Sequence, residues 1–392
     1  MQGNVTKFIE FKYPDEVGLY QKCLSKGLEP HTNLRSDQLS ETTNNALHNN
    51  HLREAGFTLL EIDSIVKLHV ATKVIKRYLE TRGTNLLDIF DAFKKLQPGA
   101  YSFDYLYILV DFIRWEAQAY IAQRNLRPHA TSFGMGGDAQ PTLNISTIAS
   151  IVAAHYLQEN PVFRDYVQCV VKIGTRAITA DIGSSDIVQS LRGFYPEGSG
   201  YISLAEMGFN KAYTPPVIET RRKLPEYGLL DICKIIFPAA NLSNAAVAVT
   251  GCSKQEYEMP MRRIAEYLNS VMVIAASKSG HDEIMLGRSS FAMKKPGKSW
   301  VVKSVEIESD DSSRRFLRAR NSLNEQEQAS IDILRGNADE HVLEVVGYNA
   351  ALLILPYIDP ADFESFGKKM TEFLISQRTA PTIVKNESFR AI

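Results

Sequence analysis

Lysine and arginine gather between Arg288 and Arg320, in a segment whose charge could hold an anion. The whole chain has 44 basic and 45 acidic residues, so this density is local. A concentrated cationic segment on a near-neutral protein favours a phosphate-bearing ligand. Its basic residues are Arg288, Lys294, Lys295, Lys298, Lys303, Arg314, Arg315, Arg318 and Arg320.

Other basic residues lie elsewhere in the sequence and could face this segment across a groove. A groove lined with such side chains would follow a sugar-phosphate backbone without reading its base sequence. Three aromatic residues, Phe291, Trp300 and Phe316, alternate with the charges and could stack on bases. We therefore predict a set of RNA-binding residues, which comprises Lys172, Arg176, Arg221, Arg222, Lys223, Lys294, Lys295, Lys298, Arg314, Arg315 and Arg318.

The same segment contains a near match to a nucleotide-binding loop at Gly297-Lys298-Ser299. Alanine at position 292 replaces the first glycine of that motif. The motif works where a strand precedes it and a helix follows, whereas the residues from Trp300 to Ile307 alternate as a strand does. An enzyme that binds phosphorylated substrates through these residues is therefore the less favoured alternative.

Other motifs are interpreted as structural. Gly134-Met-Gly136-Gly137 lacks the preceding strand and the later acidic residue that a dinucleotide site needs, so we interpret it as a flexible loop. Asp310 and Asp311 could bind a divalent ion but are interpreted as solvated loop charges. The four cysteines are scattered, as expected of reduced thiols in an intracellular protein. We expect no catalytic residues, no cofactor and no metal, and hence no enzyme.

Helical periodicity dominates the elements that would position these residues. It is strong from Thr58 to Arg82, and no part of the chain alternates strand and helix as a parallel sheet would. Helices are also expected over Pro161–Ile178 and 258–277. The predicted fold is mainly α: two helical lobes with extended arms at both ends and a short β element near 300–307. The predicted parts are an N-terminal arm 1–16, an N-lobe 17–216, a C-lobe 217–376 and a C-terminal arm 377–392.

This layout resembles the nucleoproteins of non-segmented negative-strand RNA viruses, and the shorter bornavirus and mymonavirus types are closest in style. Ser290-Phe291-Ala292-Met293 is similar to an aromatic-Ala-Met-Gly signature of the paramyxovirus branch, with Lys294 in place of the glycine. The resemblance implies a structural protein that encapsidates single-stranded RNA between its lobes, without sequence specificity, as a viral ribonucleoprotein.

Further partners and a location follow from the resemblance. Homo-oligomers, either rings or helical nucleocapsids, would form through exchange of the arms at Thr6–Tyr13 and Thr382–Ile392. A viral polymerase or its cofactor would recognise the assembly, in the virion and in the host cell cytoplasm or nucleus. No apolar stretch is long enough to span a bilayer, so no membrane partner is expected. A second alternative is the coat protein of a filamentous positive-strand RNA virus, with its groove inside one helical core domain.

Overall fold

The computed structural model describes residues 2–30, 49–81, 103–134, 142–174, 182, 184–204, 236–253 and 255–386. The chain divides into two compact units. Unit 1 comprises 1–116 and 214–236, and unit 2 comprises 117–213 and 237–392. The boundaries expected from the sequence, at residues 16, 216 and 376, stay a prediction.

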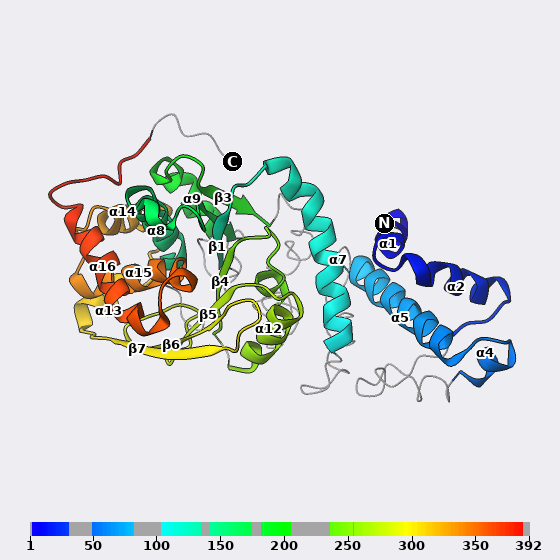
Figure 1. Cartoon of the computed structure of the whole chain (residues 1–392). Helices are drawn as coiled ribbons and strands as arrows, with labels where there is room; N and C mark the ends of the chain where they lie inside the picture. Colours follow the sequence, from blue (N-terminus) through cyan, green and yellow to red (C-terminus); the bar gives the residue numbers. More distant parts are fainter. Residues whose placement is uncertain are drawn as a thin grey trace. The chain divides into compact units, whose positions relative to one another are not determined.

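Unit 1 is helical where it is described (Figure 1). Its aromatic core forms where Phe8 meets Phe112, with 5.2 Å between ring centroids, and Leu68 packs with them. The sequence predicts an extended arm at Thr6–Tyr13, but most of these residues lie in a helix whose buried face carries Val5, Phe8 and Ile9. The helices are α1 (Gln2–Lys12), α2 (Pro14–Ser25), α4 (Asn50–Glu54), α5 (Leu59–Thr81) and α7 (Phe103–Ile121), the last of which continues into unit 2.

Unit 2 is built on a seven-stranded mixed sheet in the order β3-β2-β1-β4-β5-β6-β7. The first five strands in the chain are parallel, and β6 and β7 add to the edge as antiparallel neighbours. The strands are β1 (His129–Gly134), β2 (Cys169–Gly174), β3 (Gly200–Ser203), β4 (Val247–Gly251), β5 (Met272–Ser277), β6 (Gly287–Lys294) and β7 (Val301–Ile307).

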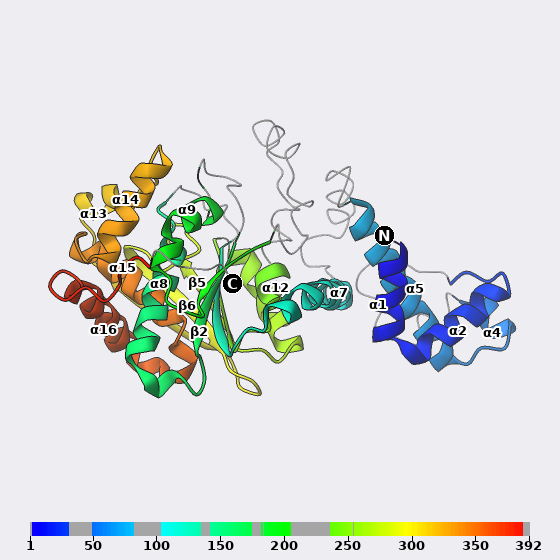
Figure 2. The same ribbon diagram turned by 90° about the horizontal axis from the view of Figure 1, so that it is seen from above.

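Helices cover both faces of this sheet (Figures 1 and 2). On one face, α8, α15 and α16 pack together with the strands in the largest apolar core, while α12 lies on the other face. The helices are α8 (Ile145–Glu159), α9 (Ser184–Leu191), α12 (Gln255–Tyr267), α13 (Asp311–Leu317), α14 (Leu323–Leu334), α15 (Glu340–Leu352) and α16 (Phe363–Ser376). Short 3-10 turns are η1 (Ala122–Arg124), η2 (Pro161–Phe163), η3 (Arg192–Phe194), η5 (Leu355–Tyr357) and η6 (Pro360–Asp362).

The mainly helical prediction is therefore wrong for unit 2. The residues expected as a helix over Pro161–Ile178 contain β2, and those over 258–277 contain both α12 and β5. The cause is burial on both sides of the sheet: every residue of β2 is buried, so its sequence is a short apolar run without polar alternation. The strand expected near 300–307 is confirmed as β7, which alternates because it is an edge strand.

The described part of the C-terminal arm packs on its own chain. Ile383 is buried in the large core of unit 2, and the backbone amide of Asn386 donates to Gly193 O at 2.6 Å. The side chain of Gln377 accepts from the amides of Thr382 and Ile383, which fixes the turn into this segment. Residues 382–386 are thus part of their own unit. Within the described residues, no helix combines the length and the apolar character that a bilayer crossing requires.

Candidate functional site

The carboxyl ends of the parallel strands define the candidate site. The chain adds β2 and β3 on one side of β1, and β4 and β5 on the other, so the strand order reverses between β1 and β4. In open α/β sheets, ligands bind at the carboxyl edge at such a switch point. A small pocket lies here, lined by Ser132 and Phe133 of β1 and by Val249–Gly251 of β4.

A buried lysine approaches this edge from β2. Lys172 has no exposed surface, and its Nζ donates to Ser146 Oγ at 3.2 Å. Burial lowers the pKa of Lys172, and the negative charges of Glu283 and Asp282 oppose that shift. Gly134 ends β1 beside it, where a Cβ atom would stand only 2.5 Å from the lysine Nζ. Glycine at this position therefore leaves room for the ammonium group.

An acidic turn, Asp282-Glu283-Ile284, faces the lysine from the connection between β5 and β6. Ser146 N donates to Glu283 Oε1 at 2.9 Å. Since Ser146 lies in the first turn of α8 and Asn144 makes no side-chain cap, the carboxylate serves as the anion at that helix terminus. Burial raises the pKa of Glu283, and the charge of Asp282 raises it further.

The acidic turn presses against the end of β4. A Cβ atom on Gly251 would lie 1.5 Å from the backbone oxygen of Asp282. Any side chain at this position would displace the turn, so glycine is required by close approach. On β2, which lies on the other side of β1, a Cβ atom on Gly174 would lie 3.1 Å from the Cβ atom of Ser184, which begins α9. Glycines thus end three adjacent parallel strands, β2, β1 and β4.

This site is suited to a phosphorylated ligand. It combines a buried ammonium group and a serine hydroxyl at the carboxyl ends of parallel strands, where phosphates bind in α/β folds. The acidic turn adds oxygen ligands of the kind that Mg²⁺ takes together with substrate phosphates. The geometry therefore supports chemistry on a phosphate ester.

One predicted RNA-binding residue, Lys172, lies in this site. Lys294 is buried at the end of β6, and its Nζ donates to the neighbouring Lys295 O at 3.4 Å. Lys295 and Lys298 lie in the β6–β7 turn. Because Lys294 pairs with Met272 at the start of β5, this turn lies at the amino ends of the parallel strands, away from their carboxyl ends. The remaining predicted residues are exposed on or after α13 (Arg314, Arg315 and Arg318) or lie outside the described residues (Arg176, Arg221, Arg222 and Lys223).

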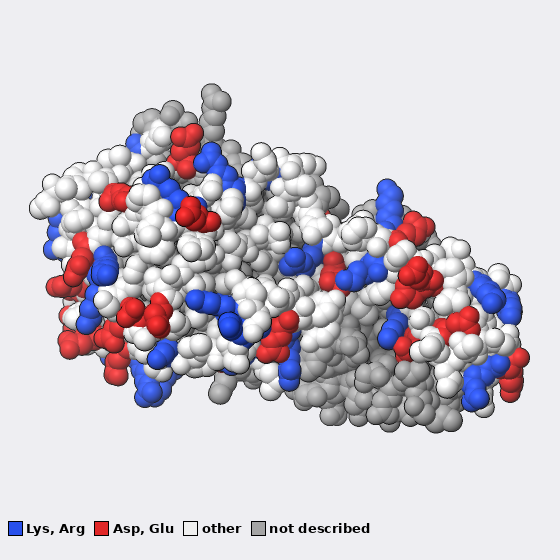
Figure 3. Space-filling view, in the orientation of Figure 1, with Lys and Arg blue, Asp and Glu red and all other residues white. Residues whose placement is uncertain are grey.

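The aromatic residues offered for base stacking are occupied within the protein. Phe291 is 1% exposed and packs on Phe363 with 4.4 Å between ring centroids. Trp300 donates through Nε1 to Glu266 at 3.0 Å, and the guanidinium of Arg262 lies over its ring. On the face shown in Figure 3, the described lysine and arginine side chains are interspersed with acidic ones and form no single patch.

Sequence reasoning missed the site because it missed the strands. The sequence argument sets Gly134-Met-Gly136-Gly137 aside for want of a preceding strand, yet β1 ends at Gly134. Residues 135–141 themselves lie outside the described residues. The expectation that a strand and not a helix follows Gly297-Lys298-Ser299 is confirmed, because β7 begins at Val301. Gly297 lies in the preceding turn with a positive φ. The usable signal was the glycine run after His129–Phe133, a short segment without Asp, Glu, Lys or Arg.

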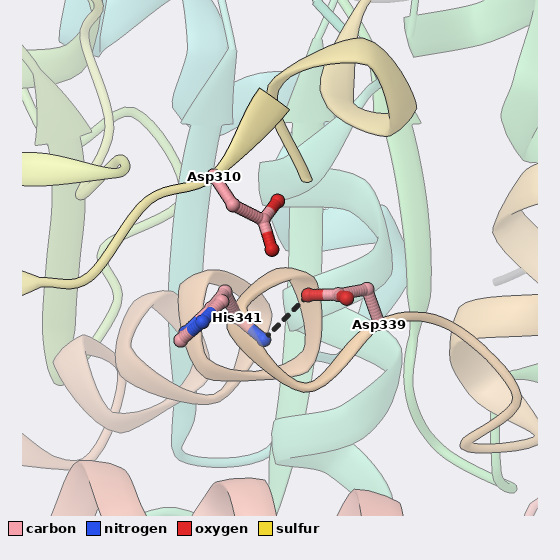
Figure 4. A group of neighbouring side chains, drawn as sticks. All are labelled: Asp310, Asp339 and His341. Atoms are coloured by element: carbon pink, nitrogen blue, oxygen red, sulfur yellow. Dashed lines mark hydrogen bonds between the residues drawn. The ribbon is translucent and has the colours of Figure 1, made fainter. Parts of the chain in front are cut away.

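A second group of potential metal ligands, Asp310, Asp339 and His341, has a structural explanation (Figure 4). Their possible ligand atoms lie within 4.8 Å of one another. Asp310 caps α13 by accepting from Ser313 N at 2.7 Å, and these hydrogen bonds lower the pKa of Asp310. Asp339 caps α15 through the backbone amide of His341 at 3.0 Å, and it also accepts from Ser313 Oγ. Helix capping accounts for this gathering of carboxylates.

Comparisons with known proteins agree with the sheet. No family model matches the chain. The anthranilate phosphoribosyltransferase of Thermus thermophilus is 28% identical over 168 residues, which are 41% of this chain and 47% of that protein. The enzyme of the same name from Persephonella marina is 26% identical over 226 residues, covering 55% of this chain and 64% of that one. The chain thus spans about half the length of the first of these curated relatives.

Solved structures give the same name. The crystal structure of the enzyme from Thermus thermophilus aligns with 78% of this chain and 95% of its own, with a TM-score of 0.51 and 18% identity, and it shows a shared fold. The enzyme from Saccharomyces cerevisiae in complex with PRPP and Mg aligns with 95% of this chain and 96% of its own, with a TM-score of 0.48 and 14% identity.

These findings correct the viral interpretation. The resemblance to a nucleoprotein is wrong, because the relatives are cellular enzymes that carry one transferase name. Four further predictions are therefore also wrong: that the protein is not an enzyme, that single-stranded RNA and a viral polymerase are its partners, that its arms form nucleocapsids, and that it is located in the virion. The alternative of a phosphate-binding enzyme is nearer, although the phosphate-suited groups lie around Lys172 and not at Lys298.

Proposed function

We propose that this chain is a phosphoribosyltransferase that binds a diphosphate-bearing ribose phosphate at the carboxyl edge of its sheet. The carrying observation is the switch-point pocket, which Ser146 and the acidic turn line and beside which the buried Lys172 donates to Ser146. The name shared by the relatives, anthranilate phosphoribosyltransferase, supports this reaction class. PRPP, which the yeast enzyme holds, is the donor that we propose for this chain.

The chain's own residues would bind the donor through its phosphates. The ammonium group of Lys172 and the hydroxyl of Ser146 are hydrogen-bond donors. Glycine at 134 leaves room for that ammonium group at the end of β1. A fully buried ammonium group acts on an anion in a poorly screened environment, which strengthens the attraction.

Asp282 and Glu283 are suited to hold a divalent cation beside those phosphates. The charge of Asp282 raises the pKa of the buried Glu283, so the pair repels itself and a cation would relieve that repulsion. Mg²⁺ binds through one or two carboxylates together with substrate phosphates, which fits this pair. When bound, such a cation would neutralise charge on the donor's diphosphate.

The proposed step is a substitution at C1 of the ribose. An acceptor nitrogen forms a bond to C1 and gives up one of its protons to solvent, while the bond from C1 to the diphosphate oxygen breaks and diphosphate leaves with the electron pair. Lys172 and Ser146 would stabilise the charge that grows on that oxygen, which is the contribution that electrostatic preorganisation makes to catalysis. The acceptor that we propose is an aromatic amine such as anthranilate, after the name of the relatives.

Diphosphate release from PRPP in the presence of Mg²⁺ and anthranilate tests the proposal. We expect acceptor-dependent release, reduced roughly 100-fold or more by Lys172→Met, because the substitution removes a positive charge aimed at the leaving group. Lys298→Met should act as the matched control and leave the rate unchanged, since Lys298 is exposed in the β6–β7 turn. Absence of release with anthranilate and with other aromatic amines would contradict the proposed reaction.

A further inference from the structure

We propose that Asn349 is the positioning residue for the acidic turn, and that α15 thereby sets where the two carboxylates lie. This inference rests on the proposed function, because it concerns the same site. It adds a residue that lies far from the turn in the sequence and belongs to a helix outside the sheet.

The side chain of Asn349 pairs with the turn as a neighbouring strand would. Its Oδ1 accepts from Ile284 N at 3.1 Å, and its Nδ2 donates to Ile284 O at 2.7 Å. Both backbone groups of the residue that follows Glu283 are therefore held by one amide. The second Nδ2 hydrogen goes to Val345 O, one turn earlier in α15, at 2.8 Å. This bond fixes the orientation of the amide on its helix.

Because these hydrogen bonds are buried, their loss is costly. Asn349 is 6% exposed and Ile284 has no exposed surface, so water cannot replace the bonds if the amide is removed. Asn349 also lines the pocket, together with Leu352 and Leu353 of the same helix region. Since both Nδ2 hydrogens are already donated to backbone oxygens, Asn349 acts on a ligand through the turn and not by direct donation.

The turn is held from three sides. Ser146 N, at the start of α8, holds the carboxylate of Glu283. Gly251, at the end of β4, limits where the backbone of Asp282 can go. Asn349 holds the residue after them. Partners that orient ligands to a metal typically change metal affinity by about 10- to 100-fold when they are lost. We expect an effect of that size here.

Binding of Mn²⁺ alone to the full-length chain, followed by isothermal titration calorimetry, tests this role. Asn349→Leu keeps the size of the side chain and removes all three hydrogen bonds, so Mn²⁺ affinity should fall roughly 10- to 100-fold. Gln377→Leu is the matched control. Gln377 is also a buried amide that accepts from two backbone amides, those of Thr382 and Ile383, but it lies outside the pocket lining. Its loss should lower thermal stability and leave Mn²⁺ affinity unchanged.

The outcomes separate the inference from the proposed function. Equal Mn²⁺ affinity in Asn349→Leu and wild type would overturn the positioning role, whatever the wild type does with PRPP. A loss of affinity in Asn349→Leu, in a wild type that releases no diphosphate, would support the role and contradict the transferase. If Asn349→Leu fails to fold by circular dichroism, Asn349→Ala gives the same comparison without inserting a branched apolar side chain. Absence of Mn²⁺ binding in the wild type also overturns the inference.

Discussion

Lys172 and Glu283 are linked through a single residue, Ser146, whose hydroxyl accepts from the lysine at 3.2 Å and whose amide donates to the glutamate at 2.9 Å. The three residues come from β2, from the β5–β6 connection and from the first turn of α8. Burial shifts the pKa of Glu283 up and that of Lys172 down, so each charge is disfavoured by lost hydration more than it is favoured by its partner. Binding of an anion beside Lys172 and a cation beside Glu283 would therefore stabilise both buried charges.

Glu283→Gln should change how stability depends on pH. Because the pKa of Glu283 is raised in the folded state, its contribution is fully present below the ordinary value of 4.5 and is lost as pH rises through the folded pKa. Glutamine stays neutral and can still accept from Ser146 N, so the variant should become more stable than wild type as pH rises from about 4 toward neutrality. Urea unfolding of both proteins across this range measures the difference. A difference that does not vary with pH would contradict the raised pKa.

Gly251→Ala should destabilise the protein and displace the acidic turn. Its Cβ atom would lie 1.5 Å from the backbone oxygen of Asp282, and backbone cannot move aside as a flexible side chain can. We expect a loss of about 3 kcal/mol in the free energy of unfolding, in the upper part of the range for overpacking. Thermal and urea unfolding would measure it.

Gly18→Ala provides the contrast for that measurement. Gly18 lies inside α2, and nothing stands within 4 Å of where its Cβ atom would be. Alanine there should raise stability by roughly 0.5–1 kcal/mol through its higher helix propensity. Equal effects of the two substitutions would show that the close approach at Gly251 has no energetic consequence.

Gly134→Ala should impair binding while the protein still folds. Here the Cβ atom would lie 2.5 Å from Lys172 Nζ, the far end of a flexible side chain that can shift. The shift would break the 3.2 Å bond to Ser146 and turn the ammonium group away from a phosphate. We expect PRPP affinity to fall about 10-fold, and the free energy of unfolding to fall by about 1–3 kcal/mol, because the buried ammonium group loses its partner. Unchanged affinity would show that the position of the lysine does not matter to the ligand.

Part of this fold could be predicted from the sequence. The helix expected from Thr58 is α5, because it carries a clear apolar stripe. The strand near 300–307 was also visible, because β7 is an edge strand with one face in solvent. Buried parallel strands such as β2 and β5 lack that alternation, and their short apolar runs look like pieces of helices. Missing them removed the sheet from the prediction.

The candidate site was harder to predict, because its residues meet only through the sheet. Lys172 was chosen for its charge, but nothing local indicates that it is buried or that Ser146 accepts from it. Nothing local in the sequence marks Asp282 and Glu283, and their importance depends on Gly251 and Asn349 from other elements. By contrast, the exposed cluster at Arg314 and Arg315 attracted attention through density alone. Charge density indicates exposed surface more readily than it indicates a site.

Calorimetric titration of PRPP with Mg²⁺ into wild type, Lys172→Met and Lys298→Met is the most direct test of where this protein binds phosphate. The account predicts one saturable site in the wild type, its loss in Lys172→Met, and unchanged binding in Lys298→Met. Lack of binding in the wild type, or binding that survives Lys172→Met and disappears in Lys298→Met, would contradict a phosphate site at the switch point of the sheet.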